Sequence, residues 1–410
     1  MNLGQDQRKA DWLELEDALA LILSKVHPLT QTEEIPTVQA LGRIAAAPVY
    51  ASLDNPPFDR SPLDGFALNS DSTRNASAEN PVKLRVTGSI AAGMVLNRQI
   101  KPGEAVQIMT GGMIPEGCDC IVKQEAVQTE GEDVLIFAPL ARHQNYVFRG
   151  EDIEKGKLLL LPGERLSSIH LALLAIMGME KVTVRRNINI GILCTGDELT
   201  PPGKALEPGK IYSSNGILLS SRLREIGFSP LLLPDSPDDP EEAAHKIESV
   251  IDNLDLFIST GGVSVGEKDI CHKVFELLGA ERLFWRITVK PSSVTLCGLF
   301  RGKLLMGLSG NPFACLCSFE LLVRPVLAKL SGCPELEGKK ISGILKADYK
   351  GRADSRRRFI RALLEDGMIT LPKGHSSGQL LSLLGCNCLA DIPPGVGFLP
   401  AGTAVTALLL

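Results

Sequence analysis

A regular alternation of apolar runs and amphipathic stretches between residues 185 and 330 constrains the fold more than any other feature. The apolar runs are short and end in turns, as in INIGILC, PLLL, DLFIS and KLLMGL. Helical spacing follows each of them, as in SSNGILLSSRLREIGF, PEEAAHKIESVIDN, ICHKVFELLG and FACLCSFELLVRPVLAKLSG. Strands that alternate with helices are joined by right-handed crossovers and form a parallel sheet with helices on both faces. We therefore predict a central three-layer parallel-sheet domain over residues 185–332.

The residues on either side of this domain follow different patterns. Apolar positions at helical spacing occupy residues 11–27, and a second helix is predicted over 167–178. Between these two helices, and again after residue 332, short β-rich runs alternate with glycine and proline turns. We therefore predict an α/β multidomain protein, with an N-terminal mixed α/β and β-rich region and a small C-terminal β-barrel-like domain.

Charge and cysteine content narrow the class of protein. A formal net charge of −5 and a sequence pI near 5.8 argue against nucleic-acid binding, which needs a basic face. We interpret the one basic run, 356–358, as a solvated turn or an anion contact. The sequence shows no secretory leader and no apolar run of about 18–20 residues, so we predict no membrane span. The ten cysteines include three Cys-x-Cys pairs but no Cys-x-x-Cys, which favours reduced thiols and a cytoplasmic protein.

Three glycine-containing loops follow strands of the predicted parallel sheet. They comprise residues 195–198 (TGDE), 259–269 (STGGVSVGEKD) and 309–312 (SGNP). In such sheets the ligand lies beyond the carboxyl ends of the strands. Glycine allows the backbone to approach a ligand closely, and the freed N–H groups together with helix N-termini attract anions. The loops therefore predict a phosphate-bearing ligand, although a glycine loop taken alone would fit any phosphate binder.

Carboxylates occur at the same predicted edge of the sheet. Glu198, Asp238 and Asp269 each follow a predicted strand. Any one of them could be a cap or turn residue. Three acids that face an anionic ligand indicate a hard cation between acids and ligand, and Mg²⁺ fits because it takes oxygen ligands and bridges phosphates. We therefore predict a Mg²⁺ site with Asp269, Glu198 and Asp238 as ligands.

Longer motifs give these loops a more specific meaning. The chain resembles the MoeA family of molybdopterin molybdenumtransferases, which includes the gephyrin E domain, over essentially its whole length. The central segment also resembles the wider molybdopterin-binding domain. The motifs that carry the resemblance are FDRSPLDGFA (58–67), QIMTGGMIPEGCDCIVKQE (107–125), RGEDI (149–153), TGDEL (195–199), IYSSN (211–215), STGGVSVGEKD (259–269), GLSGNP (307–312) and FELLVRPVLAKLSG (319–332).

The resemblance implies a division into domains and a homodimer. We predict an N-terminal region over 1–184, in which a β-rich domain (54–149) is inserted into a linker domain (1–53 and 150–184). A molybdopterin-binding αβ domain (185–332) and a C-terminal β domain (333–410) follow. Family members place the active site between the αβ domain of one subunit and the N-terminal β region of the other.

The resemblance also implies roles for individual residues. Asp64, Thr110 and Asp152 would come from one subunit, and Glu198, Asp238 and Asp269 from its partner. These acids form the implied catalytic set, and the resemblance implies that Lys290, together with Arg361 and Ser377, faces molybdate. The remaining implied substrate-binding residues are Thr195, Gly196, Gly261, Gly262, Val263, Ser264, Asn311 and Pro312.

The implied reaction is the insertion of molybdate into adenylylated molybdopterin with release of AMP. Both substrates are anions, so Mg²⁺ and Lys290 would neutralise them and fix their geometry. No nucleophilic side chain is required, and Cys194 is interpreted as a small buried residue. The resemblance implies that an upstream molybdopterin adenylyltransferase supplies the pterin substrate and is a partner.

The sequence departs from the family pattern at several of these motifs. KPSSV (290–294) stands where the family carries two lysines, so that Ser293 replaces the second lysine, and we expect Ser293→Lys to tighten molybdate binding. GLSGNP, IYSSN and the segment 146–148 (YVF) also differ from the usual pattern. Two alternatives therefore remain: a divergent paralogue that handles another oxyanion such as tungstate, and a non-catalytic dimeric scaffold.

Overall fold

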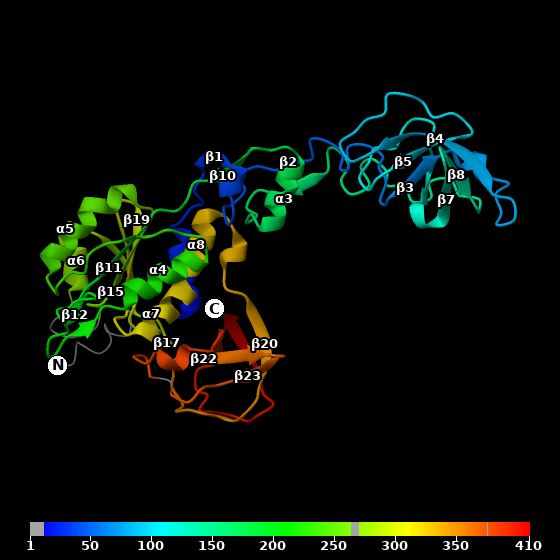
Figure 1. The fold of residues 1–410 in the computed structure, drawn as a ribbon. Coiled ribbons are helices and arrows are strands. Elements are labelled where there is room, and N and C mark those ends of the chain that lie inside the picture. Colours follow the sequence, from blue (N-terminus) through cyan, green and yellow to red (C-terminus); the bar gives the residue numbers. More distant parts are fainter. Residues whose placement is uncertain (1–11, 264–269, 375) are drawn as a thin grey trace, which may run out of the picture. The chain divides into compact units, whose positions relative to one another are not determined.

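The computed structural model describes residues 12–263, 270–374 and 376–410. The chain forms two compact units (Figure 1). Unit 1 comprises the described parts of Met1–Ala46, Pro162–Ser167 and Val182–Leu410, and unit 2 comprises Ala47–Leu161 and Ser168–Lys181. No described helix is both long enough and apolar enough to cross a membrane.

A six-stranded sheet forms the centre of unit 1, and four neighbouring strands of it pair in parallel. In spatial order its strands are β14 (Leu231–Leu232), β11 (Ile190–Cys194), β15 (Leu256–Thr260), β19 (Lys303–Leu308), β18 (Leu296–Phe300) and β16 (Glu281–Trp285). The parallel neighbours β14, β11, β15 and β19 confirm the predicted αβ domain.

Strand β18 pairs antiparallel with both of its neighbours, β19 and β16, and this reversed strand is not predicted by the alternating sequence pattern. Between β18 and β19 the chain reverses through Arg301 and Gly302, whose φ angles are +49° and +73°. A two-residue turn with both φ angles positive matches the right-handed twist of a hairpin. This short turn explains why no crossover helix separates the two strands.

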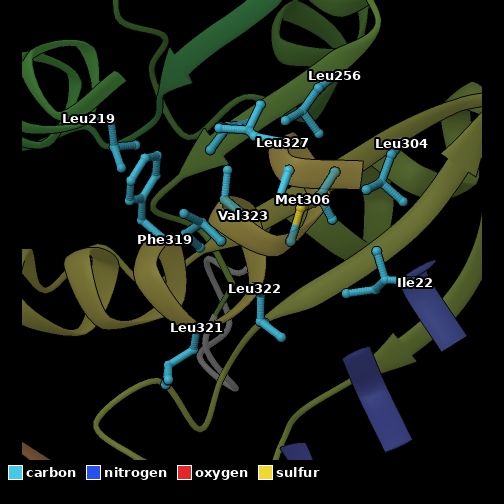
Figure 2. Packing of buried hydrophobic residues seen from close by; sticks show 14 of the residues in the cluster. Ile22, Leu219, Leu256, Leu304, Met306, Phe319, Leu321, Leu322, Val323 and Leu327 are labelled. Carbon is cyan, nitrogen blue, oxygen red and sulfur yellow. The ribbon is translucent and has the colours of Figure 1, made fainter. Parts of the chain in front are cut away.

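Helices cover both faces of this sheet because the side chains of each strand alternate between them. Ile192 of β11 lies in one buried cluster together with side chains of α2, α4 and α8, and Leu193 lies in another with side chains of α5 and α6. Figure 2 shows part of the first cluster, to which Phe319, Leu327 and the strand residue Met306 belong. The helices are α2 (Leu15–Ser24), α4 (Asn215–Glu225), α5 (Pro240–Val250), α6 (Cys271–Leu278), α7 (Pro312–Ser318) and α8 (Arg324–Ser331).

The C-terminal part of unit 1 is a closed barrel. Its strands are β22 (Arg357–Glu365), β23 (Met368–Thr370), β20 (Lys340–Leu345), β26 (Ala404–Leu409) and β24 (Cys388–Ile392), and the pairing of β24 with β22 closes the ring. The short strand β17 (Val289–Lys290) pairs in parallel with β22. The predicted barrel-like domain is therefore confirmed, and β17 joins it to the chain of the αβ domain.

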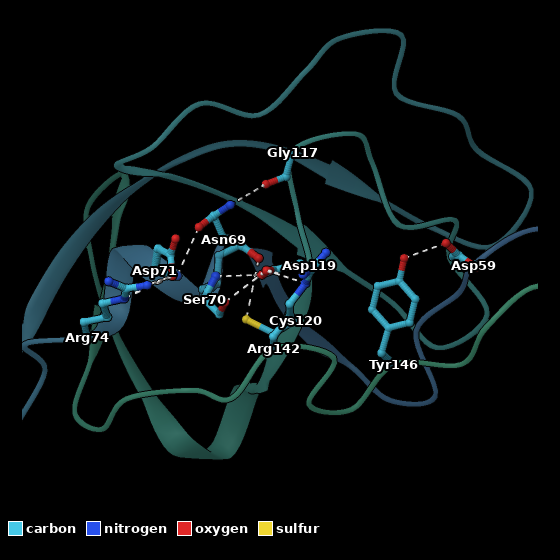
Figure 3. A network of polar contacts seen from close by, with 11 residues as sticks. Asp59, Asn69, Ser70, Asp71, Arg74, Gly117, Asp119, Cys120, Arg142 and Tyr146 are labelled. Atoms are coloured by element: carbon cyan, nitrogen blue, oxygen red, sulfur yellow. Dashed lines mark hydrogen bonds and ion pairs between the residues drawn. The ribbon is translucent and has the colours of Figure 1, made fainter.

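Unit 2 is built around a second six-stranded sheet. Its strands, in spatial order, are β6 (Cys120–Lys123), β3 (Gly65–Leu68), β5 (Glu104–Ile108), β4 (Val82–Ile90), β8 (Asp133–Ile136) and β7 (Val127–Glu130). Asp119 fixes one end of this sheet, because its carboxylate accepts hydrogen bonds from the amide of Ser70 at 2.7 Å and from its hydroxyl at 3.0 Å (Figure 3). The helix α3 (Ser168–Ile176) falls within the predicted range 167–178.

Two-stranded pairs complete the fold. They are β1 (Thr32–Pro36) with β10 (Lys181–Arg185), β2 (Val49–Tyr50) with β9 (Leu158–Leu160), β12 (Leu199–Thr200) with β13 (Ile211–Tyr212), and β21 (Tyr349–Lys350) with β25 (Phe398–Leu399). Of these, β12, β13 and β21 contribute residues to cavities of unit 1.

Candidate functional site

Three loops leave the central sheet at one edge. The strands β11, β15 and β19 are parallel, and their last residues Cys194, Thr260 and Leu308 lie in register across the sheet. The second loop needs its glycine, because Gly261 has a φ of +101° and a Cβ there would lie 2.1 Å from the backbone oxygen of Thr195. The sequence pattern and the sheet geometry therefore agree on where these loops meet.

Asn215, the first residue of α4, holds two of the loops together. Its amide group donates to the hydroxyl oxygen of Thr260 at 2.9 Å and to the carbonyl oxygen of Gly310 at 2.8 Å. The Thr260 hydroxyl in turn donates to the carbonyl oxygen of Ser309 at 2.9 Å. Asn215 was not among the residues predicted for the site. Its position at the end of the IYSSN motif was the one feature of the sequence that could have pointed to it.

The loops line a cavity of about 580 Å³, which we call the loop cavity. The predicted site residues that line it are Thr195, Gly196, Glu198, Asp238, Gly261, Gly262, Val263, Asn311 and Pro312. The hydroxyl oxygen of Thr195 is buried and has no hydrogen-bond partner among the described residues. A buried hydroxyl without a partner is costly, so this position suits a polar ligand atom.

Two carboxylates stand at the loop cavity. The Glu198 carboxylate lies over Gly196, since a Cβ on that glycine would be 2.7 Å from Glu198 Oε2. Asp238 is tied to the first loop, because its amide donates to Asp197 Oδ1 at 3.1 Å. The predicted residues Ser264 and Asp269 lie outside the described residues. The described part of the chain contains no cluster of three or more His, Cys, Asp or Glu residues that could hold a metal ion.

A second cavity, of about 530 Å³, adjoins the first. We call it the cation cavity, because Lys290, Lys350 and Arg358 are among its lining residues. It shares Val294, Ser309 and Asn311 with the loop cavity. The other residues that line it are Pro291, Ser292, Ser293, Phe313, Ala314, Tyr349, Gly351, Phe359, Ile360 and Ser377. The structure therefore brings the predicted residues Lys290 and Ser377 to one cavity.

Asp354 forms ion pairs with Lys290 and Arg356. The ammonium of Lys290 lies 2.8 Å from Asp354 Oδ2, and the guanidinium of Arg356 lies 3.0 Å from Asp354 Oδ1. The hydrogen bonds from Arg356 and Lys290 hold the pKa of Asp354 well below its usual range. Lys290 therefore reaches the cation cavity as one half of an ion pair.

Arg361 does not line either cavity. Its side chain is fully buried, stacks on the ring of Phe313 and donates to the carbonyl oxygens of Ser376 and Gln379. It also donates to the hydroxyl of Ser382 at 2.5 Å. This geometry lets Arg361 shape the loop that carries Ser377, and it offers no open path from the guanidinium to a ligand.

The remaining predicted residues, Asp64, Thr110 and Asp152, belong to unit 2. Asp64 Oδ1 accepts hydrogen bonds from the Thr110 amide at 2.7 Å and from its hydroxyl at 2.8 Å, and these bonds lower the pKa of Asp64. Asp152 is exposed and accepts from the side-chain amide of Asn55 at 2.8 Å. Asp64 and Thr110 are thus joined directly by hydrogen bonds, whereas the hydrogen bond of Asp152 is to Asn55.

The cysteine next to the loop cavity is poorly suited to nucleophilic chemistry. Cys194 is buried, and desolvation raises the pKa of its thiol to about 12. Because the thiolate is the nucleophile, a thiol with this pKa is almost wholly protonated at neutral pH. None of the ten cysteines forms a disulfide, and nine of them are buried.

Comparison with known proteins gives one consistent family. The model for the MoeA N-terminal region (domains I and II) matches residues 13–178, and that for the MoeA C-terminal region (domain IV) matches residues 342–410. Between them, the model for a probable molybdopterin binding domain matches residues 191–329.

Individual relatives cover nearly the whole chain. The molybdopterin molybdenumtransferase of Staphylococcus epidermidis is 34% identical over 402 residues, which are 97% of this chain and 95% of that protein. The one of Bacillus subtilis is 36% identical over 388 residues, which cover 93% of this chain and 90% of that protein. The crystal structure of a molybdopterin biosynthesis MoeA protein from Pyrococcus horikoshii superimposes with a TM-score of 0.81 at 30% identity, covering 97% of this chain and all of that one.

Proposed function

Since the chain belongs to the MoeA family of molybdopterin molybdenumtransferases, we propose that it inserts molybdate into adenylylated molybdopterin and releases AMP in a Mg²⁺-dependent reaction. Its place in molybdenum-cofactor biosynthesis and its class, a transferase, follow from this membership. The proposed location is the cytoplasm, and a molybdopterin adenylyltransferase is the proposed source of the pterin.

The observation that supports the reaction is the pair of adjoining cavities. One is lined by glycine loops and carboxylates, and the other by lysine, arginine and hydroxyl side chains. A substrate with phosphates at one end and a dithiolene at the other could occupy the loop cavity and present its sulfurs to an oxyanion in the cation cavity. The shared wall residues Val294, Ser309 and Asn311 would keep the two ligands in contact.

The residues of the loop cavity fit a Mg²⁺ ion. Glu198 and Asp238 offer carboxylate oxygens there, and we propose Asp269 as a further ligand. Mg²⁺ is usually held by one or two carboxylates together with substrate phosphates, so this set is sufficient. When bound, the ion would neutralise the phosphates and so allow AMP to leave.

The chain's own groups would then do the positioning. The Thr195 hydroxyl has a hydrogen bond to give, and the backbone around Gly261 and Gly262 can approach a phosphate closely. Lys290 and Ser377 would contact molybdate from the second cavity. The proposed reaction needs no covalent enzyme intermediate. Holding the two anions at reacting distance would therefore supply a large part of the rate enhancement.

We further propose that the active site is completed by a homodimer. Asp64, Thr110 and Asp152 of one subunit would face the loop cavity of its partner. Unit 2 carries apolar side chains that suit an interface: Ile169 and Ile176 lie two helical turns apart on α3 and are 67% and 45% exposed. Clustered exposed apolar side chains often mark such interfaces.

AMP release tests the reaction directly. Purified protein would be mixed with adenylylated molybdopterin, and AMP would be measured by chromatography with and without molybdate and Mg²⁺. We expect release to require both. Equal release in the presence of a chelator, or without molybdate, would contradict the proposal.

The metal ligands are tested in the same assay. We expect Glu198→Gln and Asp238→Asn each to lower the rate of AMP release by about tenfold or more, the equivalent of 1.4 kcal/mol, because an amide gives the cation only a dipole. Glu241→Gln is the matched control, since Glu241 is exposed in the first turn of α5 and does not line the loop cavity. Excess Mg²⁺ should partly rescue the two ligand variants and leave the control unchanged.

One observation keeps tungstate open as the oxyanion. Ser293 adds no positive charge to the cation cavity, so the pocket is not a simple copy of the two-lysine pattern. Titration of both oxyanions, with anomalous scattering from soaked crystals, would decide between them. A marked preference for tungstate would assign the chain to the paralogue with another oxyanion.

A further inference from the structure

The basic run 356–358 contains three arginines whose charges are used differently. Arg356 pairs with Asp354 at 3.0 Å. Arg357 pairs with Asp391 on the barrel strand β24 and with Glu16 on helix α2. Arg358 forms no ion pair with any carboxylate among the described residues, so its charge is the one that remains uncompensated.

The strand register directs Arg358 toward Lys290. Arg358 on β22 is the direct partner of Lys290 on the parallel strand β17. Residues paired across neighbouring strands project from the same face of a sheet, and both side chains line the cation cavity. The flanking Arg357 projects to the other face, where it meets Asp391.

The guanidinium of Arg358 has donors to spare. Its Nη1 donates to the hydroxyl oxygen of Tyr349 at 3.2 Å, which fixes the orientation of the group. Its Nε is buried and has no acceptor among the described residues. The protein therefore leaves donors of this guanidinium unused, and Arg358, unlike Arg361, lines the cation cavity, where a ligand could supply acceptors.

The other cations of the cavity are already paired. Lys290 lies 2.8 Å from Asp354, and the ammonium of Lys350 lies 3.7 Å from Asp348 Oδ2. Neither of these aspartates lines the cavity, and none of the described residues that line it carries a carboxylate. Ser293 cannot replace a cation here, and its hydroxyl already accepts a hydrogen bond from Arg356 at 3.2 Å.

We propose that Arg358 is a specificity-determining residue that binds the oxyanion substrate and supplies the positive charge that position 293 does not carry. This inference rests on the proposed function. With Nη1 held by Tyr349, the Nε and Nη2 atoms form an edge of two parallel donors. Such an edge matches two oxygens of a tetrahedral dianion, and charge-assisted paired hydrogen bonds of this kind are strong and directional.

Calorimetric titration of molybdate at fixed ionic strength tests the role of Arg358. We expect Arg358→Gln to raise the dissociation constant by about tenfold or more. Arg358→Lys keeps the charge but loses the paired donors, so it should fall between wild type and Arg358→Gln. Arg352→Gln is the matched control, since it removes the same charge from an exposed position that does not line the cavity, and its affinity should equal that of wild type.

Further measurements separate binding from folding. Each variant would be checked by thermal unfolding, and AMP binding at the loop cavity should be unchanged in all of them. Should Arg358→Gln fail to fold, wild-type crystals soaked in molybdate give the same answer. We expect the anomalous molybdenum peak to place an oxyanion oxygen within about 3 Å of the Arg358 guanidinium.

The outcomes distinguish this inference from the proposed function. Wild-type affinity in Arg358→Gln, or a molybdenum peak out of reach of Arg358, would overturn the inference while molybdate-dependent AMP release stands. Failure of the wild-type protein to bind molybdate would overturn both.

Discussion

At the scale of single residues, Asp354 organises the cation cavity. It accepts from Lys290 and from both the amide and the guanidinium of Arg356. With its pKa held below the ordinary value of 3.8, the carboxylate stays ionised at neutral pH and through much of the acid range. Both cations are therefore positioned under any condition in which the reaction would be assayed.

A pH dependence of stability follows from the lowered pKa of Asp354. Its contribution to stability is complete above the unfolded-state pKa, near 3.8, and is lost as pH falls through the lower folded-state pKa. We therefore expect Asp354→Asn to lower the thermal unfolding midpoint most at neutral pH, and less at about pH 3 than at pH 7.

The matched control for this measurement is Asp348→Asn. Asp348 is 41% exposed and stands 3.7 Å from Lys350, so its effect should be small at every pH. A difference between Asp354→Asn and wild type that stayed constant from pH 3 to pH 7 would show that the ion pairs do not stabilise the fold.

The sequence led us to expect that Ser293→Lys tightens molybdate binding, and the contacts of Ser293 in the structure argue against this. Arg356 Nη1 lies 3.2 Å from Ser293 Oγ, so a lysine at position 293 would meet a like charge. We now expect Ser293→Lys to leave molybdate affinity unchanged or to weaken it. Calorimetry alongside Ser293→Ala, which removes the hydroxyl without adding charge, would check this; tighter binding by Ser293→Lys would show that the lysine avoids Arg356 and reaches the oxyanion.

At the scale of elements, the helical segment that runs from α7 to α8 is interrupted by a change in its hydrogen-bonding pattern. A π-helical turn, Phe319–Val323, separates the two helices. It places Glu320 inside the protein with 0% of its side chain exposed, where it pairs with Arg222 of α4 at 2.6 Å and Arg324 of α8 at 2.7 Å. Helix α4, which carries Asn215 at its start, is thereby fixed to the helix that follows the third loop.

Neutralising Glu320 should destabilise the protein strongly. Removing one member of a buried ion pair leaves the others uncompensated, and we expect Glu320→Gln to lower the free energy of unfolding by about 3 kcal/mol. Denaturant titration would measure it. Glu225 also pairs with Arg222 but is 58% exposed, so Glu225→Gln should cost less than about 1 kcal/mol. Equal losses in the two variants would mean that burial adds nothing to the pair.

At the scale of the whole molecule, the predicted residues are divided between the two units. Glu198 and Asp238 belong to unit 1, and Asp64 and Asp152 to unit 2. The proposed homodimer joins the two sets across subunits. Light scattering at micromolar concentration should therefore give a mass of about twice the 44.1 kDa of the chain.

Mixed dimers test whether one site draws on two subunits. We expect Asp64→Asn and Glu198→Gln to be inactive in AMP release when each is purified alone. In a heterodimer of the two variants, one site receives both substitutions and the other receives neither. Co-expression should therefore restore activity, whereas mixed dimers without activity would mean that each site is built from a single chain.

The sequence alone determined the fold class and the edge of the sheet where the three glycine-containing loops meet. The alternation of apolar runs with helical spacing, the glycine at position 261 and the break into short β runs after residue 332 are local features. Such local features can be predicted from the sequence because periodicity and the allowed φ angles depend only on residues that are close along the chain. The longer motifs added the family, which the comparisons confirmed.

Only the tertiary structure decided which charges reach the cavities. Arg361, which family resemblance placed near molybdate, is buried against Phe313, whereas Arg358, three residues earlier on the same strand, lines the cation cavity. Lys290 pairs with Asp354, which lies 64 positions away in the sequence, and Arg222 pairs with Glu320, which lies 98 positions away. Partners this distant meet only when strands and helices pack, so no pattern in neighbouring residues records which cation stays paired and which is left to bind a ligand.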